Sequence, residues 1–416
     1  MNKINLTLEN ILNNLIIFFP VVFFFRSLTI NIIVIFISII FIIICIVKKN
    51  NFLKYEYNKL LLFFFGYFFI LQFFQSTDLE KIIKSFFLLK FFLLFNAAIY
   101  VFSNVNIEKL KKKFLYVFTV ICIFIIDLYI QYYFGKNILG LKASFCEPGP
   151  GCLRYSGMFG SELVAGGYLS IIGISVLFLL HSLYNKKFNV FVPLIILFSV
   201  FITGERTALI LVILFNLIYL FFYIKINLKK LFVIMLVIFS FIFFSKDVTI
   251  ERYSNDTINL INTNGNLSLV DSIKTTPWGL HYTASILMIK KNPLFGNGFK
   301  SFREDCSNYK YLNIREQRVH NVCSSHPHNF HLEVMVDSGI FGYLILLASV
   351  YFFLKRYFQY EELKKNKLLL VMFLYLITFI FFPRPTGSIL STFFGSMFWY
   401  FIGSVLGYTN LRKIGT

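Results

Sequence analysis

Long apolar runs separated by short polar stretches are the feature that most limits how this chain can fold. Hydrophobic residues make up 57% of the 416 residues and charged residues only 14%. Such a chain has too little polar surface to cover a soluble globule. A hydrocarbon core of ~30 Å requires roughly 20 apolar residues per helix, and twelve runs in the sequence reach or approach this length. The sequence therefore predicts an all-α polytopic membrane protein with about twelve transmembrane helices.

The predicted helices divide the chain into three parts. Residues 1–245 hold helices one to nine, residues 246–327 form one large loop, and residues 328–416 hold helices ten to twelve. The predicted spans are Leu8–Phe25, Leu28–Val47, Leu60–Phe74, Ile82–Phe102, Phe114–Phe134, Gly160–Leu180, Phe188–Ile202, Thr207–Ile224, Leu231–Ser245, Phe330–Leu354, Leu368–Phe382 and Ile389–Gly407.

The formal charge of +20 is distributed between the helices and is not gathered on one soluble face, so nucleic acid is not a predicted partner. Basic residues concentrate in alternate loops, such as Lys109, Lys111, Lys112 and Lys113 between the fourth and fifth spans. The positive-inside rule then places both termini in the cytoplasm and the large loop outside. An 82-residue loop is too long for a simple connector, so a functional role is expected.

Four cysteines lie in the segments assigned to the outer side. Cys146 and Cys152 flank a Gly-Pro turn, and Cys306 and Cys323 lie in the large loop. Disulfides persist in an oxidising compartment such as the periplasm. We expect disulfides among these four residues, although the sequence does not decide the pairing.

A histidine-rich segment, S-H-P-H-N-F-H at 325–331, begins the tenth predicted helix. Pro327 suits the first helical position, and Ser325 or His326 could cap the helix. His328 would then lie in the first turn, where the helix dipole keeps its imidazole neutral and able to act as a general base. The simpler alternative is a capping or interfacial histidine. A zinc site with His326 and His331 is disfavoured because Pro327 makes convergence awkward.

Several blocks resemble the superfamily of O-antigen ligases and O-antigen polymerases. His328-Asn329 is followed by nine residues, Gly339, two residues and Gly342. The other blocks are R-Y-S-G-M-F-G-S-E-L-V-A-G-G-Y-L at 154–169, T-G-E-R-T-A-L at 203–209, N-P-L-F-G-N-G-F at 292–299 and F-R-E-D-C at 302–306. Together they cover most of residues 150–345, whereas the first 140 residues match only in hydropathy.

The resemblance implies a GT-C-like, metal-independent and inverting glycosyltransferase of the bacterial inner membrane. Its donor would be a glycan on undecaprenyl diphosphate, and its acceptor a hydroxyl of lipid A core or of another glycan at the periplasmic face. His328 matches the family's catalytic histidine, and Arg206 matches the arginine that binds the diphosphate. Without the resemblance, Arg206 could equally be an interfacial arginine paired with Glu205. No cofactor is expected, because neither a Walker A sequence nor a dinucleotide fingerprint is present.

The resemblance leaves a second diphosphate contact open. The family has another arginine in the large loop, but Trp278-Gly279-Leu280-His281 stands where we would look for it. The candidates for this contact and for other substrate contacts are His281, Arg252, Arg303, Arg154, Glu162, Asn329 and Arg384. For Arg154 and Glu162 the alternative is a mutual salt bridge, and for Arg384 an interfacial position beside membrane lipids.

Ionisable residues within the predicted spans are costly unless they are paired or functional. Lys90 and Asp127 could form a structural pair between the fourth and fifth spans. Helical spacing puts Glu333 and Asp337 on one face, away from His328.

Three activities share this donor chemistry and differ in the acceptor. A ligase uses lipid A core, a polymerase the growing carrier-linked glycan, and a protein O-oligosaccharyltransferase a protein hydroxyl. The sequence slightly favours the ligase because the His-Asn signature has its full spacing. A transporter or flippase is less favoured, since its polar groups should lie near the bilayer midplane and here they lie at predicted outer helix ends.

Overall fold

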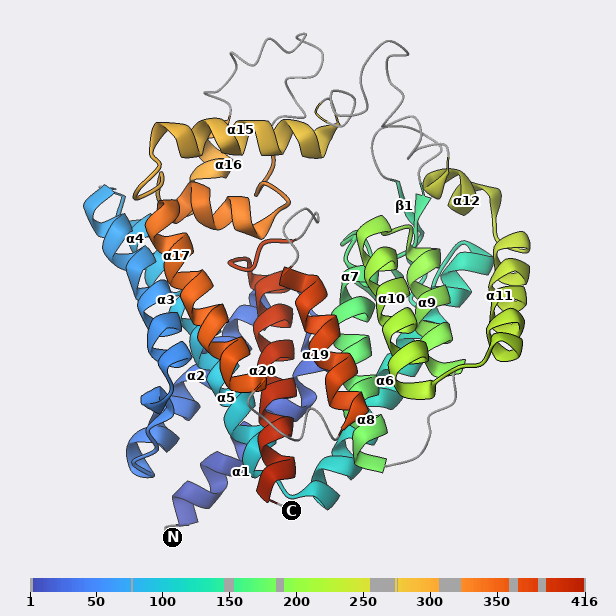
Figure 1. The fold of residues 1–416 in the computed structure, drawn as a ribbon, viewed down its shortest axis with the longest axis horizontal. Helices are drawn as coiled ribbons and strands as arrows, with labels where there is room; N and C mark the ends of the chain where they lie inside the picture. Colours follow the sequence, from blue (N-terminus) through green and yellow to red (C-terminus); the bar gives the residue numbers. More distant parts are fainter. Residues whose placement is uncertain are drawn as a thin grey trace.

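The computed structural model describes residues 3–75, 78–145, 153–184, 191–254, 274, 276–306, 323–358, 366–380 and 387–414. Helices dominate this part of the chain (Figure 1). Its strands are β1 (Ser144–Phe145) and β2 (Leu153–Arg154), which pair antiparallel with Phe145 opposite Leu153. The protein is therefore an all-α helical bundle with one very short hairpin.

The first third of the chain forms one side of the bundle. Its helices are α1 (Lys3–Val22), α2 (Ser27–Val47), α3 (Glu56–Gln75), α4 (Leu79–Phe86), α5 (Leu89–Asn104) and α6 (Ile107–Phe134), with the short turn η1 (Phe52–Lys54) before α3. Local sequence sets the ends of α6. The Asn106 side chain accepts hydrogen bonds from the Glu108 and Lys109 amides, and Gly135 ends the helix with a φ of 80°.

A second group of helices continues from the hairpin. It comprises η2 (Gly157–Phe159), α7 (Ala165–Tyr168), η3 (Leu169–Gly173), α8 (Ile174–Tyr184), α9 (Phe191–Thr203), α10 (Arg206–Ile218), η4 (Tyr219–Ile224), α11 (Leu228–Phe243) and α12 (Asp247–Tyr253). The last group is α15 (Pro277–Lys291), α16 (Ser301–Asp305), α17 (Phe330–Phe358), α19 (Lys367–Ile380) and α20 (Thr392–Ile414).

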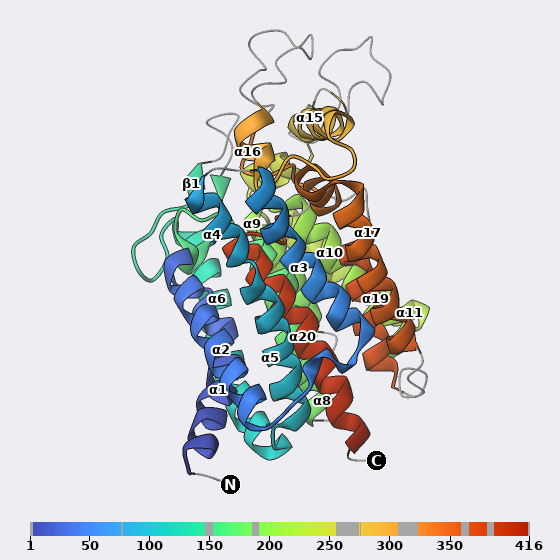
Figure 2. The same ribbon diagram turned by 90° about the vertical axis from the view of Figure 1, so that its left-hand side faces the viewer.

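Helix α20 is packed closely against α5 in the middle of the bundle (Figures 1 and 2). Glycines allow this approach, because a Cβ at Gly403 would lie 2.5 Å from the Phe95 carbonyl oxygen and one at Gly407 2.7 Å from that of Ile99. Small residues serve this purpose in membrane helices, where close backbone packing replaces the hydrophobic effect. The core around this pair is rich in buried aromatic rings, including Phe95, Trp399 and Tyr400.

Helices occur at each of the twelve predicted spans, but the number of membrane crossings is smaller when it is judged by length and composition. Within the described residues, seven helices are long and apolar enough to cross a membrane, or eight if α11 and α12 together form one bent span. Leu6–Val22, Val192–Thr203 and Lys367–Ile380 are apolar but shorter. The polytopic all-α prediction is supported, whereas the count of twelve is not confirmed.

Helix α17 is broken at Gly339, which has φ 68° and ψ −173°. The N-P-L-F-G-N-G-F segment packs against this break. The Asn297 and Gly298 amides donate to the carbonyls of Val336 and Asp337 at 2.8 and 3.0 Å, and the Ile340 amide donates to Pro293 at 2.8 Å. The predicted tenth span, Phe330–Leu354, is present within α17, but the helix is kinked at Gly339, where the released backbone groups bind a loop.

One prediction about charged residues inside the spans also requires correction. Lys90 and Asp127 do not pair: Lys90 donates to Asn31, and Asp127 accepts from the Asn137 side chain at 3.1 Å and the Ile138 amide at 2.9 Å. Each group is satisfied within its own neighbourhood, so the structure has no need of a pair between α5 and α6.

Both chain termini lie at one end of the bundle, whereas α15 and α16 lie at the opposite end (Figures 1 and 2). Helix α20 runs along the bundle and ends at Ile414, near the C-terminus. The loop-derived helices and the termini are thus separated by the length of the bundle.

Candidate functional site

A cavity of about 490 Å³ lies at the end of the bundle that carries α15. We call it the arginine–histidine cavity, because Arg154, Arg206, Arg252, His326 and His328 all line it. These residues come from the hairpin, from α10, from α12 and from the segment before α17. Four positions predicted from separate sequence blocks are therefore brought to one cavity.

The three arginines are held by backbone carbonyls. Arg206, the first residue of α10, donates from Nε and Nη2 to the Arg252 carbonyl at 3.2 and 2.9 Å. Arg252 donates from Nε to the Gly204 carbonyl at 2.8 Å, and Arg154 donates from Nη2 to the Leu163 carbonyl at 3.0 Å. Such contacts restrict long side chains that would otherwise lose entropy on binding a ligand.

Glu205 connects this arginine group to the start of α7. Its carboxylate oxygens accept hydrogen bonds from the Gly166 and Gly167 amides at 2.8 and 3.0 Å, and Oε1 lies 3.3 Å from Arg154 Nη2. A Cβ at Gly166 would lie 2.6 Å from Thr203 Oγ1 and 2.8 Å from Glu205 Cβ. This contact explains why the A-G-G segment carries glycine beside the T-G-E-R block.

The sequence suggested other partners for these charges. The alternatives to functional roles are a pair of Glu205 with Arg206 and a pair of Glu162 with Arg154, but Glu205 binds Arg154, and Glu162 is exposed and does not line the cavity. The correction arises because the hairpin folds back over the end of α9, which no local pattern reveals. Glu205 is thus a residue of the site that sequence reasoning missed; its position within a matching block was the available signal.

His328 lies just before α17 and not in its first turn, because the helix begins at Phe330. Its φ of 54° is in the left-handed region, which non-glycine residues rarely adopt. The Asn329 side-chain oxygen caps the helix, accepting from the His331 amide at 2.9 Å and the Leu332 amide at 3.2 Å. The predicted Pro327 start is therefore wrong. Asn329 is 1% exposed and does not line the cavity.

Two other imidazoles surround the His328 ring. The His326 ring centroid is 4.3 Å away, and the His281 ring from α15 is stacked at 5.3 Å with an interplanar angle of 25°. Burial lowers the pKa of His328 below its ordinary value of 6.5, because a partly desolvated site disfavours the charged imidazolium. The neutral form expected from the helix dipole is thus favoured here by desolvation.

His331 faces a different part of the protein. Its Nε2 donates to the Ile380 carbonyl at 2.9 Å, and its Nδ1 accepts from the Tyr343 hydroxyl at 3.0 Å. Across the described residues, no group of three or more histidine, cysteine, aspartate or glutamate side chains could hold a metal ion. The three histidines of the 325–331 segment do not converge.

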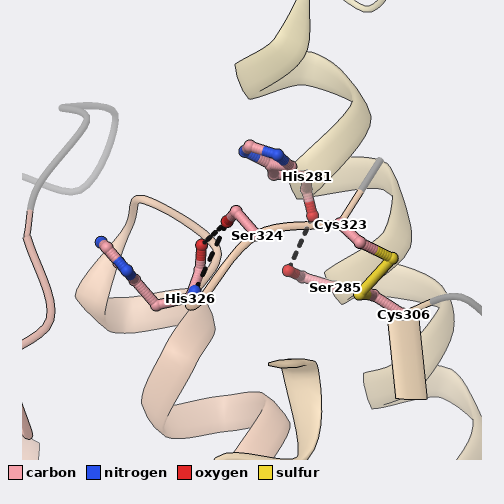
Figure 3. Close-up of a disulfide and its surroundings, with 6 residues drawn as sticks. All are labelled: His281, Ser285, Cys306, Cys323, Ser324 and His326. Atoms are coloured by element: carbon pink, nitrogen blue, oxygen red, sulfur yellow. Dashed lines mark hydrogen bonds between the residues drawn. A yellow bond between two sulfur atoms is a disulfide. The ribbon is translucent and has the colours of Figure 1, made fainter. Parts of the chain in front are cut away.

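A disulfide supports the histidine side of the cavity (Figure 3). It joins Cys306, at the end of α16, to Cys323, three residues before His326. Figure 3 shows the chain running from Cys323 through Ser324 to His326, below His281 on α15. Buried Leu280, Met288, Phe302 and Val336 form a small core around these elements. The disulfide thus anchors the segment that carries the cavity's histidines.

The rest of the cavity wall is largely apolar. The residues nearest the bundle interior come from η3, α10, α19 and α20, and they include Ile171, Leu211, Phe379, Phe393, Phe394 and Met397. Ser388 also lines the cavity and donates to buried Glu333 at 2.5 Å. Glu333 therefore lies behind the cavity wall, whereas Asp337 binds the Lys300 amide and the Ser301 hydroxyl.

The remaining predicted residues are outside this cavity. Arg303 is exposed on α16, and His281 reaches the site only through its contact with the His328 ring. Arg384, Cys146 and Cys152 lie outside the described residues. Trp278, at the start of α15, also lines the cavity.

Comparison with known protein families gives one match. Residues 191–347 match the family model described as O-antigen ligase. The match spans α9, α10, the large loop and the break in α17, so it includes Arg206, His328 and the Gly339 signature. It confirms the resemblance recognised from the sequence blocks. A comparison with curated proteins finds no match.

Proposed function

We propose that this chain belongs to the superfamily of O-antigen ligases and O-antigen polymerases, because residues 191–347 match the family model described as O-antigen ligase. The proposed reaction transfers a glycan from undecaprenyl diphosphate to an acceptor hydroxyl. The single observation that carries this proposal is the convergence of two imidazoles and three guanidinium groups in a cavity with an apolar inner wall. A polyprenyl diphosphate has matching parts, a charged head and a hydrocarbon tail.

The arginines are proposed to bind the donor's diphosphate. Arg206, Arg252 and Arg154 contribute three positive charges to the cavity wall, whereas Glu205 contributes one negative charge. The planar guanidinium fork binds phosphate oxygens through paired hydrogen bonds. These cations would stabilise the negative charge that develops on the diphosphate as it leaves. Arg252 and Arg154 are proposed as the further contacts that the sequence left open.

His328 is proposed as the general base. Its neutral imidazole would accept the proton of the acceptor hydroxyl while that oxygen attacks the anomeric carbon. The bond between the anomeric carbon and the diphosphate oxygen breaks with its electron pair on the diphosphate, so the configuration inverts. A pKa below 6.5 keeps the base form available at neutral pH. No step requires a metal ion.

The acceptor is proposed to be lipid A core, which makes the protein an O-antigen ligase of the inner membrane with its cavity at the periplasmic face. The full His-Asn signature and the location of the cavity opposite both termini support this assignment. Polymerase and protein O-oligosaccharyltransferase activities would use the same donor site and are tested through the choice of acceptor.

Purified protein in liposomes, supplied with a labelled undecaprenyl-diphosphate glycan and separate acceptors, tests the proposal. We expect His328→Ala to reduce transfer by roughly 100-fold or more, as for loss of a general base. Arg206→Lys should also lose most activity, because a lysine cannot supply the two-pronged contact. Transfer to lipid A core, to carrier-linked glycan or to protein identifies the acceptor.

Arg303→Lys is the matched control, because Arg303 is exposed and does not line the cavity. Its transfer rate should equal that of the unaltered protein. Full transfer by His328→Ala would exclude the proposed base. Movement of the glycan across the bilayer without coupling to any acceptor would instead support a transporter.

A further inference from the structure

A second cavity, of about 860 Å³, lies at the end of the bundle that carries the two termini. We call it the terminal-end cavity. Its walls come from the end of α2, the start of α3, and the ends of α5, α17 and α20. It shares no residue with the arginine–histidine cavity and has no part in the proposed transfer reaction.

The charge of this cavity has one sign. Lys48, Lys49, Lys54 and Arg356 line it, and the described lining residues include no aspartate or glutamate. Lys48 is paired with Glu9, which lies outside the lining. Lys49 and Lys54 are exposed and take no part in that pair, and a concave surface with like charges concentrates an anion.

Stacking on an aromatic ring orders Arg356, the cation that α17 contributes to this cavity. The Arg356 guanidinium carbon lies 3.6 Å from the Tyr55 ring centroid, and Lys54 Nζ lies 4.9 Å from the same centroid. Tyr55 is in turn stacked on Tyr57 at 5.6 Å with an interplanar angle of 7°. Stacking uses the face of a guanidinium, whereas hydrogen bonds to a phosphate use its edge.

The lining also supplies neutral polar groups. Asn50, Asn51, Asn58, Asn96, Asn104 and Asn410 line the cavity. Asn58 and Asn96 are buried and joined by a hydrogen bond of 2.9 Å from Asn58 Nδ2 to Asn96 Oδ1. Side-chain amides both donate and accept, so they suit hydroxyl groups next to a phosphate. The combination matches a phosphate ester of a polyol.

Exposed apolar side chains lie along α2, the helix that ends at this cavity with Lys48 and Lys49. Ile39, Ile43, Ile46 and Val47 are between 39% and 72% exposed on this helix, which is a candidate membrane span. Exposed side chains of this kind face hydrocarbon in a membrane protein. The charged rim therefore lies where a lipid headgroup and its acyl chains would meet.

We propose that the terminal-end cavity binds a phosphate-bearing polyol headgroup, such as that of phosphatidylglycerol. The cations bind the phosphate, the asparagine amides bind the headgroup hydroxyls, and the acyl chains lie along α2. The same headgroup chemistry occurs in soluble glycerol 3-phosphate, so the test must separate the lipid from the free ester.

Native mass spectrometry of the full chain in detergent measures retention of added phosphatidylglycerol, phosphatidylcholine and glycerol 3-phosphate. The test variant is Lys54→Gln/Arg356→Gln. The control is Lys229→Gln/Lys230→Gln, which removes two exposed lysines at the start of α11. We expect phosphatidylglycerol to be retained over phosphatidylcholine, and its affinity to fall roughly tenfold in the test variant alone.

Two outcomes support the site and identify its ligand. If the test variant loses retention of phosphatidylglycerol, the ligand is a membrane lipid. If it loses retention of glycerol 3-phosphate to the same extent, the ligand is a soluble ester. Equal retention of both lipids, or unchanged retention in the test variant, overturns the proposal. If the double variant unfolds, Lys54→Gln alone gives the same comparison, because Lys54 is exposed.

Discussion

The two cavities of this protein hold similar numbers of cations but hold them in different ways. In the arginine–histidine cavity, each arginine is bound to a backbone carbonyl, and Arg154 is also paired with Glu205. In the terminal-end cavity, Lys49 and Lys54 are exposed, and Arg356 is ordered by the Tyr55 ring. The first arrangement is preorganised, whereas the second retains side-chain freedom.

The difference in side-chain freedom suits the two ends of the bundle to different functions. Stabilising a transition state requires cations whose positions are set before the charge develops, because reorganisation during the reaction costs energy. Binding a headgroup requires only attraction at the membrane surface, which flexible lysines provide. The predictions that follow alter the elements on which the preorganised end depends.

The largest effect is expected from the backbone at the break in α17. A Cβ at Gly339 would lie 2.2 Å from the Leu294 carbonyl oxygen, and the residue has a φ of 68°. Gly339→Ala should therefore lower the free energy of unfolding by at least about 2 kcal/mol. Thermal unfolding in detergent measures the change.

Gly66→Ala is the matched control, because a Cβ at Gly66 in α3 meets nothing within 4 Å. Its unfolding free energy should be unchanged or raised by less than about 1 kcal/mol. Equal stability of the two variants would contradict the proposed role of the loop packed at Gly339.

The next effect concerns the carboxylate that holds the arginine group. Glu205→Gln removes the charge paired with Arg154 and turns an amide group toward the Gly166 or Gly167 amide. We expect transfer to fall roughly 10- to 100-fold, because Arg154 loses the carboxylate that fixes its position. Glu162→Gln, at an exposed position outside the cavity, should retain the full rate. A Glu205→Gln rate within about twofold of normal would show that the arginines need no such support.

The smallest effect is expected in the pH dependence of transfer. The reaction needs neutral His328, so kcat/KM should rise with pH through its pKa and then level off. Since burial places this pKa below 6.5, the loss at pH 6.5 should be less than about twofold. His281→Ala, which uncovers one face of the His328 ring, should move the midpoint up toward 6.5. An acidic midpoint above 6.5 in the unaltered protein would rule out desolvation as the controlling factor.

Much of the candidate site could be predicted from short sequence blocks. His328 and Arg206 were recognised because their neighbours match a family pattern, and the matched region 191–347 includes both. Arg154 and Arg252 were candidates without assigned partners. Glu205 was given the wrong partner, since an adjacent arginine is the obvious choice in the sequence, whereas the carboxylate binds Arg154 and two amides of α7.

The ends and packing partners of helices were also not fully predictable from local sequence. Pro327 and the residues before it suit a helix start, yet the Asn329 side chain caps α17 two residues later. Gly339 suited close helix packing, yet it receives the loop containing Leu294 and Gly296. Local propensity is compatible with several helix starts and several packing partners, and contacts with distant segments select among them.

The sequence by itself determined that the chain forms apolar helices, that its charges alternate between loops, and which blocks resemble the O-antigen ligase family, because these properties depend on neighbouring residues. The tertiary structure decided which blocks meet. Arg154, Arg206, Arg252 and His328 share one cavity only because helices from distant parts of the chain pack together. Such contacts depend on the shapes of whole surfaces, which no short pattern contains.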